Sequence, residues 1–140
     1  MKRKGKILFY RKHQKKIFIL LGQRSSKEGE VFWWIPGGGV EGDETFFQGA
    51  VRELYEELVP TESMEIAVNL YHTGEPEYIG YKTSFSENRI FFIPLQDATV
   101  PEIKDEFDLL KWFASDELPE NMSSQFYKIK DQVFNKLRLV

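Results

Sequence analysis

Cysteine is absent from the 140-residue sequence. This excludes a disulfide framework, a thiolate zinc site and a thiol nucleophile, and it fits the reducing cytoplasm, where we expect the chain to act. Long apolar runs are also missing: IFILL at 17–21 and IFFIPL at 90–95 are too short to span a bilayer, so we expect no membrane partner. The basic first residues are not followed by a long apolar region with a cleavage site, so we expect no secretory signal.

Internal repeats, low-complexity stretches and linkers are lacking as well. The apolar content of 41% and the aromatic content of 15% are those of an ordinary globular protein. We therefore expect a single domain over residues 1–140, long enough to build its own core.

Acidic residues are absent from residues 1–16, which carry eight Lys and Arg, although the net charge of the chain is −3. Such a segment could attract nucleic acid or nucleotide phosphates. We favour a solvated edge strand that its lysines keep soluble, and a nucleic-acid partner stays the alternative.

Short runs of apolar and aromatic residues predict strands, and two longer segments in which apolar residues recur with helical periodicity predict the two main helices. The expected strands are 6–10, 15–24, 31–36, 64–74, 77–86, 89–96 and 107–113. The expected helices are 46–58 and about 123–140, with a helical turn at 115–120, a glycine turn at 37–44 and an acidic loop at 97–106. Together they predict an α/β domain with a central mixed sheet.

The helix at 46–58 has a clear start signal. Thr45 can cap it, and Gln48, three residues later, completes a capping box. Apolar residues recur at helical spacing and form one buried face: Phe47, Ala50, Val51, Leu54 and Leu58.

Three glutamates of this helix lie on an adjoining face. Glu53, Glu56 and Glu57 are spaced i, i+3 and i+4, so their side chains are neighbours and repel one another without a cation between them. Oxygen ligands of this kind suit Mg²⁺ or Mn²⁺. Magnesium commonly keeps bound waters and is shared between protein carboxylates and substrate phosphates.

Three glycines precede the helix, at 37–39, and allow close backbone approach and positive φ. With the helix they fit the pattern G-x5-E-x7-R-E-U-x-E-E, in which U is a bulky aliphatic residue. The matching residues are Gly38, Glu44, Arg52, Glu53, Leu54, Glu56 and Glu57. This segment resembles the Nudix box of the Nudix (MutT-like) hydrolases, and WWIPGG at 33–38 resembles the family's lead-in.

The resemblance implies an α/β/α sandwich and metal-dependent hydrolysis of a nucleoside diphosphate linked to another group. It implies that Glu56 and Glu57 bind Mg²⁺ or Mn²⁺, and that Glu53 is a further ligand or the general base. It also implies a metal contact from a glycine carbonyl, here Gly37. Arg52 would then orient a glutamate, and Glu44 would brace the loop.

Members of the family often add a carboxylate from the loop before the late strand. Glu102, Asp105 and Glu106 lie in that loop, and we favour Glu106 as the catalytic one. The box spans 38–60, but its usual ending, x-G-U, is replaced here by Leu58, Val59 and Pro60. We expect the helix to stop by residue 58 or 59 with a different exit turn, because a residue before proline avoids the helical conformation.

The substrate is left open by the sequence. Pro76 and Tyr78 match the subfamily markers of both ADP-ribose and dinucleoside-polyphosphate hydrolases, and nucleoside triphosphates and nucleotide sugars stay equally open. Candidate substrate contacts are Arg24, Trp33, Tyr78 and Arg89. The alternatives are a non-catalytic nucleotide sensor of the same fold and a hydrolase of the 5′ end of RNA that uses the basic residues 1–16. A homodimer is a further open alternative, since dimers are common among the proteins it resembles.

Overall fold

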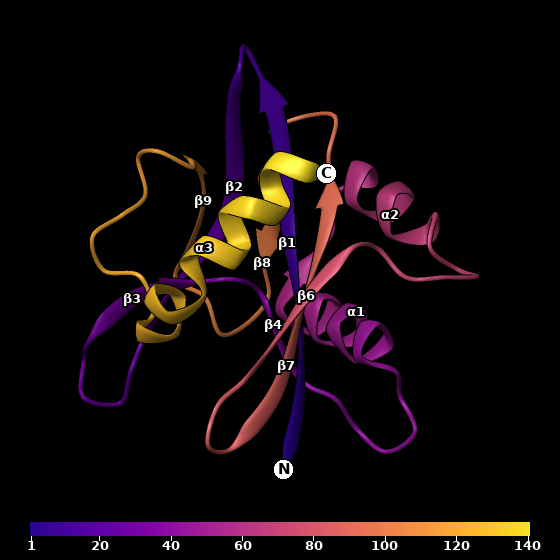
Figure 1. Cartoon of the computed structure of the whole chain (residues 1–140), viewed down its shortest axis with the longest axis vertical. Helices are drawn as coiled ribbons and strands as arrows, with labels where there is room; N and C mark the ends of the chain where they lie inside the picture. The colour runs from indigo at the N-terminus through magenta and orange to yellow at the C-terminus, as the bar shows by residue number, and fades with distance from the viewer.

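The computed structural model describes residues 1–140 and shows a mixed β-sheet with helices on both faces (Figure 1). The strands are β1 (Lys2–His13), β2 (Lys16–Ser25), β3 (Val31–Trp34), β4 (Gly37–Gly39), β5 (Leu58–Val59), β6 (Tyr78–Lys82), β7 (Ser86–Pro94), β8 (Glu102–Ile103) and β9 (Leu109–Ala114). The helices are α1 (Phe46–Glu57), α2 (Glu62–Asn69) and α3 (Ser124–Leu139). The predicted α/β class and its two main helices, α1 and α3, are confirmed, and α2 is added to them.

The main sheet follows the order β3-β2-β1-β7-β6, with β4 also pairing with β1, and β9 with β2. The strand β1 is therefore central, and the interpretation of the basic segment as an edge strand is wrong. Its middle, Ile7–Phe9, is fully buried and needs a neighbour on each side. Along one edge β1 runs parallel to β7, from Lys2↔Ser86 to Tyr10↔Pro94, whereas its other partners are antiparallel.

The glycines at 37–39 form the strand β4 and not a turn, which corrects the prediction for the start of 37–44. They pair with residues 4–6 of β1, with Lys6 opposite Gly37. A Cβ atom on Gly37 would lie 2.3 Å from the carbonyl oxygen of Gly5, so only glycine allows the two backbones to come this close. The turn follows the strand, where Gly42 has a φ of 47°.

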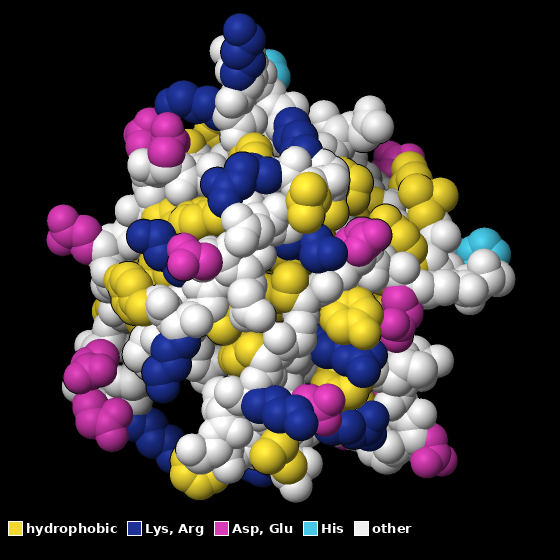
Figure 2. Space-filling view, in the orientation of Figure 1, with side chains coloured by type: hydrophobic (Ala, Val, Ile, Leu, Met, Phe, Trp, Pro, Cys, Tyr) yellow, Lys and Arg dark blue, Asp and Glu magenta, His cyan; other side chains and the backbone are white.

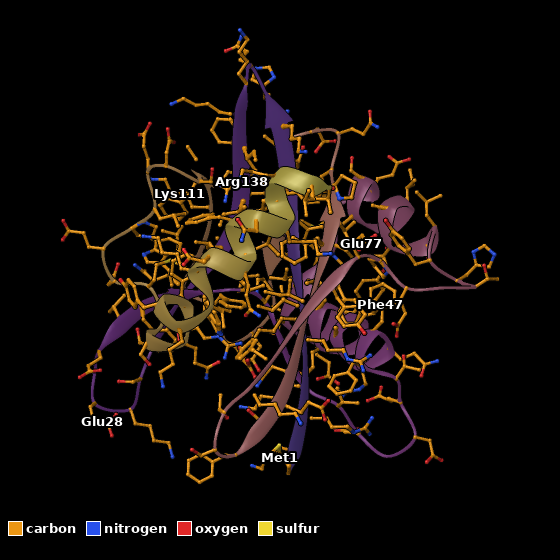
Figure 3. All side chains as sticks on the ribbon, viewed as in Figure 1. Met1, Glu28, Phe47, Glu77, Lys111 and Arg138 are labelled. Atoms are coloured by element: carbon orange, nitrogen blue, oxygen red, sulfur yellow. The ribbon has the colours of Figure 1, made fainter.

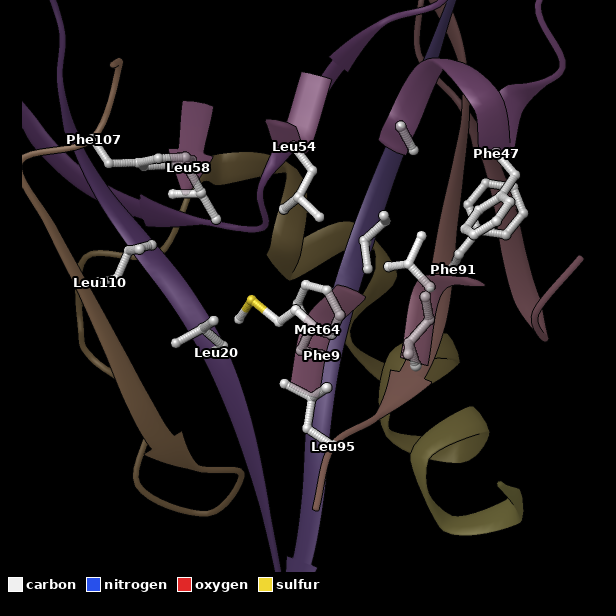
Figure 4. Close-up of a cluster of buried hydrophobic side chains, with 14 of the residues drawn as sticks. Phe9, Leu20, Phe47, Leu54, Leu58, Met64, Phe91, Leu95, Phe107 and Leu110 are labelled. Carbon is white, nitrogen blue, oxygen red and sulfur yellow. The ribbon is translucent and has the colours of Figure 1, made fainter. Parts of the chain in front are cut away.

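The helix α1 begins and ends close to the predicted residues. Thr45 Oγ1 accepts a hydrogen bond from the Gln48 amide, and the Gln48 side chain accepts one from the Thr45 amide, which confirms the capping box. The helix lies directly on β1 at Gly5, where a Cβ atom would be 2.3 Å from the Phe46 carbonyl oxygen. Leu54 of α1 joins a core cluster that includes Phe9, Leu20, Phe91 and Phe107 (Figure 4).

Residues 64–74 do not form the predicted strand, because residues 62–69 are the helix α2. Thr61 caps this helix by accepting a hydrogen bond from the Met64 amide. Met64 and Val68, one helical turn apart, are its buried residues. Residues 115–120, predicted as a helical turn, form no helix, and a turn is closed there by the hydrogen bond from the Glu117 amide to the Ala114 carbonyl.

The other face of the sheet is covered by α3, as predicted for the C-terminal segment (Figure 1). Its buried residues, Phe126, Ile129, Val133 and Leu137, pack against a second core cluster that includes Trp34 and Phe92. Glu77, labelled in Figure 3, accepts a hydrogen bond from Lys136 of α3 at 3.1 Å. None of the three helices has both the length and the apolar character that a membrane-spanning helix requires.

Candidate active site

The three glutamates of α1 differ in their exposure. Glu57 is 1% exposed, Glu53 is partly buried and Glu56 is exposed. The strand β4 passes beneath Glu53, since a Cβ atom on Gly38 would lie 2.6 Å from the Glu53 carboxyl carbon. The glycine strand thus leaves room for one carboxylate of the helix against the sheet.

Arg52 lies among the carboxylates at the start of the site. Its Nε and Nη2 donate to the two oxygens of Glu44 at 2.9 and 3.1 Å, and Nη2 also donates to the carbonyl of Gly39 at 2.7 Å. Its Nη1 donates to Glu53 at 3.3 Å and to Glu56 at 3.1 Å. One guanidinium therefore joins the loop after β4 to the carboxylate face of α1.

The loop glutamate is fixed as a carboxylate. The hydrogen bonds from Arg52, together with one from the Glu41 amide, hold the pKa of Glu44 below its usual range. The same contacts with Glu44 raise the pKa of Arg52. This geometry is that of a brace between loop and helix.

Arg24 of β2 connects the buried Glu57 to the late loop. Its Nη2 donates to Glu57 Oε2 at 2.8 Å and to Glu106 Oε2 at 2.7 Å. The guanidinium lies 4.6 Å above the ring of Phe107, which is itself packed on Gly22. The sequence pointed to Arg24 as a substrate contact, and the structure places it between two carboxylates.

Burial is the largest influence on the pKa of Glu57 and of Glu53. It raises the pKa of Glu57 to about 7, although the charge of Arg24 opposes this shift. Burial also raises the pKa of Glu53, against the hydrogen bond from Arg52. A further cation nearby would therefore stabilise the ionised form of both carboxylates.

The residues fit a divalent metal ion. Glu57 Oε1 is buried and has no hydrogen-bond partner, so one oxygen of an already desolvated carboxylate is left without a donor or a cation. The side chains around it offer carboxylate oxygens, which Mg²⁺ and Mn²⁺ prefer. As the side chains stand, no three His, Asp or Glu groups come close enough together to hold an ion, and Arg24 and Arg52 lie in contact with the carboxylates.

Of the three loop acids, only Glu106 hydrogen-bonds to Arg24 beside Glu57. Glu102 belongs to β8 and pairs with Val59, and the Asp105 side chain accepts a hydrogen bond from the Glu106 amide. Glu106 has a φ of 70°, an uncommon left-handed conformation for a residue other than glycine.

The remaining substrate candidates lie in two places. Arg89 of β7 is sandwiched between the rings of Phe46 and Tyr78, 4.3 and 4.7 Å from their centres. Trp33 is buried and packs edge-to-face on Phe113 at 4.8 Å, so it belongs to the core.

Sequence reasoning missed a buried cation next to the glycine strand. Lys6 is 7% exposed and forms no ion pair, and its Nζ lies 5.9 Å from the centre of the Trp34 ring. Burial and the charge of Arg24 lower the pKa of Lys6 to about 8. The signal was present in the sequence, because Lys6 directly precedes the apolar run of β1.

A family model described as the NUDIX domain matches residues 4–135. The chain belongs to the Nudix family. No curated protein matches its sequence closely. The fold matches the Ap4A hydrolase of C. elegans in a binary complex, at 23% identity and a TM-score of 0.61 over 99% of this chain and 93% of that one. It also matches the Nudix hydrolase RenU of M. smegmatis, at 15% identity and a TM-score of 0.75 over 98% and 86%.

A further match covers only part of a larger protein. The bifunctional NMN adenylyltransferase/ADP ribose pyrophosphatase of Francisella tularensis, solved with AMP and a Mn ion, is 22% identical with a TM-score of 0.65. The match covers 96% of this chain and 41% of that one. Family membership makes this chain a pyrophosphohydrolase of the class that uses divalent metal ions.

Proposed function

We propose that the chain hydrolyses the diphosphate linkage of a nucleoside diphosphate joined to another group, with Mg²⁺ or Mn²⁺ as cofactor. The observation that carries this proposal is Glu57, a buried carboxylate on the box helix with one oxygen left without a partner. The complete set of box glutamates and the family membership support it.

The metal would be held by Glu56, Glu57 and Glu53 of α1, together with the carbonyl of Gly37 in β4. When bound, it polarises phosphoryl oxygens and stabilises the charge on the leaving phosphate. Arg52 keeps Glu53 and Glu56 in place through its hydrogen bonds at 3.3 and 3.1 Å, which limits the reorganisation that the site needs.

A general base must take the proton of the attacking water, and two carboxylates are candidates. Burial raises the pKa of Glu53, which brings it closer to the operating pH. Glu106 is the loop acid that reaches the buried end of the site through Arg24. Replacing each by glutamine separates them: the base variant loses kcat and the matching limb of its pH profile, whereas the other keeps that limb.

Substrate phosphates would meet the cations that line this region. Arg24 is partly exposed, and Arg89 contacts the rings of Phe46 and Tyr78 and forms no ion pair. The related folds include proteins that are named for Ap4A and for ADP-ribose. We therefore place dinucleoside polyphosphates and ADP-ribose first among the substrates to be tested.

A screen of dinucleoside polyphosphates, ADP-ribose, nucleoside triphosphates and nucleotide sugars, each with Mg²⁺, Mn²⁺ or EDTA, tests the proposal. We expect release of a nucleoside monophosphate or of inorganic phosphate or pyrophosphate, abolished by EDTA. Glu57→Gln should lower kcat by roughly a hundredfold or more while the fold is retained. If the protein binds nucleotides but turns over none of these substrates, the proposal fails and the protein is a non-catalytic nucleotide-binding module.

A further inference from the structure

The last carbonyls of α1 are capped by a segment from far along the chain. A helix end leaves carbonyls without partners, and α1 has neither a glycine cap nor a basic residue in its last turn. The Glu57 carbonyl instead accepts hydrogen bonds from the amides of Lys104 and Asp105, at 2.7 and 3.1 Å. The Lys104 ammonium donates to the Tyr55 carbonyl at 2.9 Å.

The replaced box ending brings this segment to the helix. At Leu58 the chain is already extended, with φ −132° and ψ 155°. Val59 is β-branched and precedes Pro60, and both features favour an extended backbone over a helical or left-handed one. The result is the strand β5, which pairs with β8 through Leu58↔Ile103 and Val59↔Glu102.

The docked loop ends in the carboxylate that reaches the site. Directly after the two capping amides comes Glu106, held with φ 70° and with its amide bonded to the Asp105 side chain at 2.8 Å. A left-handed glutamate is retained only where its surroundings hold it. Its side chain then shares the Arg24 guanidinium with Glu57.

We propose that Val59 and Pro60 are positioning residues: by directing the chain into β5, they dock residues 102–106 on the end of α1 and so set Glu106 beside Glu57. The role of Glu106 in this inference rests on the proposed function, whereas the docking itself does not. The Val-Pro ending thus supplies a function of its own in place of the usual glycine cap.

Hydrogen exchange measures the docking without any substrate. In Val59→Gly/Pro60→Leu, which restores the usual box ending, we expect the Lys104 and Asp105 amides to exchange at least about tenfold faster and trypsin to cleave after Lys104. Val59→Thr keeps a β-branched residue before proline and should retain the protection. Unchanged protection in the double variant would overturn the proposal.

Disruption from the loop side gives an independent test. Lys104→Pro removes the amide that donates to Glu57, whereas the matched Lys104→Ala removes only the side chain. We expect faster exchange of the Asp105 amide in the proline variant and a much smaller change in the alanine variant. Equal exchange in the two variants would mean that the amide contact does not hold the loop, and the proposal would fail.

A double-mutant cycle separates positioning from general destabilisation. On the substrate found by the screen, Val59→Gly/Pro60→Leu and Glu106→Gln should each lower kcat by roughly tenfold, with KM nearly unchanged. The variant that combines both changes should have a kcat only slightly lower than that of either variant alone, because both changes act through the same carboxylate. Full additivity would refute the coupling. If the wild-type protein hydrolyses no nucleotide, the proposed function fails, while the exchange experiment still decides the docking.

Discussion

At the scale of single residues, two arginines hold the carboxylates of the site. Arg52 contacts Glu44, Glu53 and Glu56, and Arg24 contacts Glu57 and Glu106. Removing one carboxylate from such a group leaves an arginine without one of its partners, and removing an arginine leaves two or more like charges together. The two arginines thus hold the carboxylates in place, although burial still raises the pKa of Glu57 and Glu53.

Tyr81, on the face of the sheet that α3 covers, gives a pH-dependent prediction. Burial raises the pKa of Tyr81 to about 12, and its hydroxyl donates to Gln125 at 2.7 Å. The unfolded chain loses this proton near its ordinary pKa of about 10, so the stabilisation is complete below pH 10 and is lost as the pH rises towards 12. Relative to Tyr81→Phe, the wild-type protein should lose about 1–2 kcal/mol over this range, allowing for solvent screening.

Urea denaturation of both proteins from pH 8 to 12 measures this difference. Below pH 10 the wild-type protein should be the more stable by about 1 kcal/mol, the usual value of a hydrogen bond. A difference that stays constant from pH 8 to 12 would contradict the prediction.

The box residues were predictable from the sequence, but their contacts were not. The spacing of Glu53, Glu56 and Glu57 places them on one helix face whatever the fold around them. The contact of Glu57 with Arg24 depends on β2, and that of Arg24 with Glu106 on a left-handed residue in a loop. Such long-range contacts leave no periodic signal in the sequence.

At the scale of elements, α1 can pack closely on the sheet because Gly5 of β1 has no side chain. A Cβ atom on Gly5 would meet the Phe46 carbonyl at 2.3 Å and the Ala50 Cβ at 3.0 Å. The distance between α1 and β1, and with it the height of the glutamates above β4, depends on this glycine.

Gly5→Ala should therefore push the whole carboxylate helix away from the sheet. We expect a loss of about 1–3 kcal/mol of unfolding free energy, as in other overpacked cores, and a lower kcat/KM. Gly80→Ala is the matched control, since its new Cβ would meet nothing closer than 3.7 Å. Urea denaturation and turnover measure both, and equal effects of the two changes would show that α1 is free to adjust.

Two elements show where the sequence misled. The run from Met64 is rich in apolar residues and reads as a strand, yet Thr61 caps it and Met64 and Val68 share one helix face. The glycines of 37–39 are typical of a turn, yet they form a strand because β1 approaches too closely for any Cβ on Gly37. In both cases the deciding contact comes from another part of the chain.

At the scale of the whole molecule, the positive charge on the surface does not follow the cluster of Lys and Arg that the sequence shows in residues 1–16. Of the basic residues 1–16, Lys6 is buried and Arg3 donates to the carbonyls of Gly42 and Glu44, at 2.8 and 3.0 Å. Lys and Arg side chains do gather near the β6–β7 hairpin, at the lower end of the face in Figure 2. A test of RNA binding should therefore neutralise exposed residues such as Lys2, and not Arg3 or Lys6.

Metal ions should stabilise the whole fold if they bind the folded site alone. At a free concentration about a hundred times Kd, the gain is about 2.7 kcal/mol, which raises Tm by roughly 5–10 °C for a chain of this size. Scanning calorimetry with Mg²⁺, Mn²⁺ or EDTA measures the shift, and Glu57→Gln should reduce it. A Tm unaffected by millimolar concentrations of both ions would contradict the metal assignment.

The parallel pairing of β1 with β7 also sets an order of events during synthesis. Residues 2–10 find their parallel partners only at 86–94, so this side of the first strand stays unpaired until most of the chain has left the ribosome. Until then the part of the sheet that α1 packs on lacks the strand β7. The box helix is thus among the first segments made and among the last to become rigid, and chaperone contacts with nascent chains should persist until β7 has emerged.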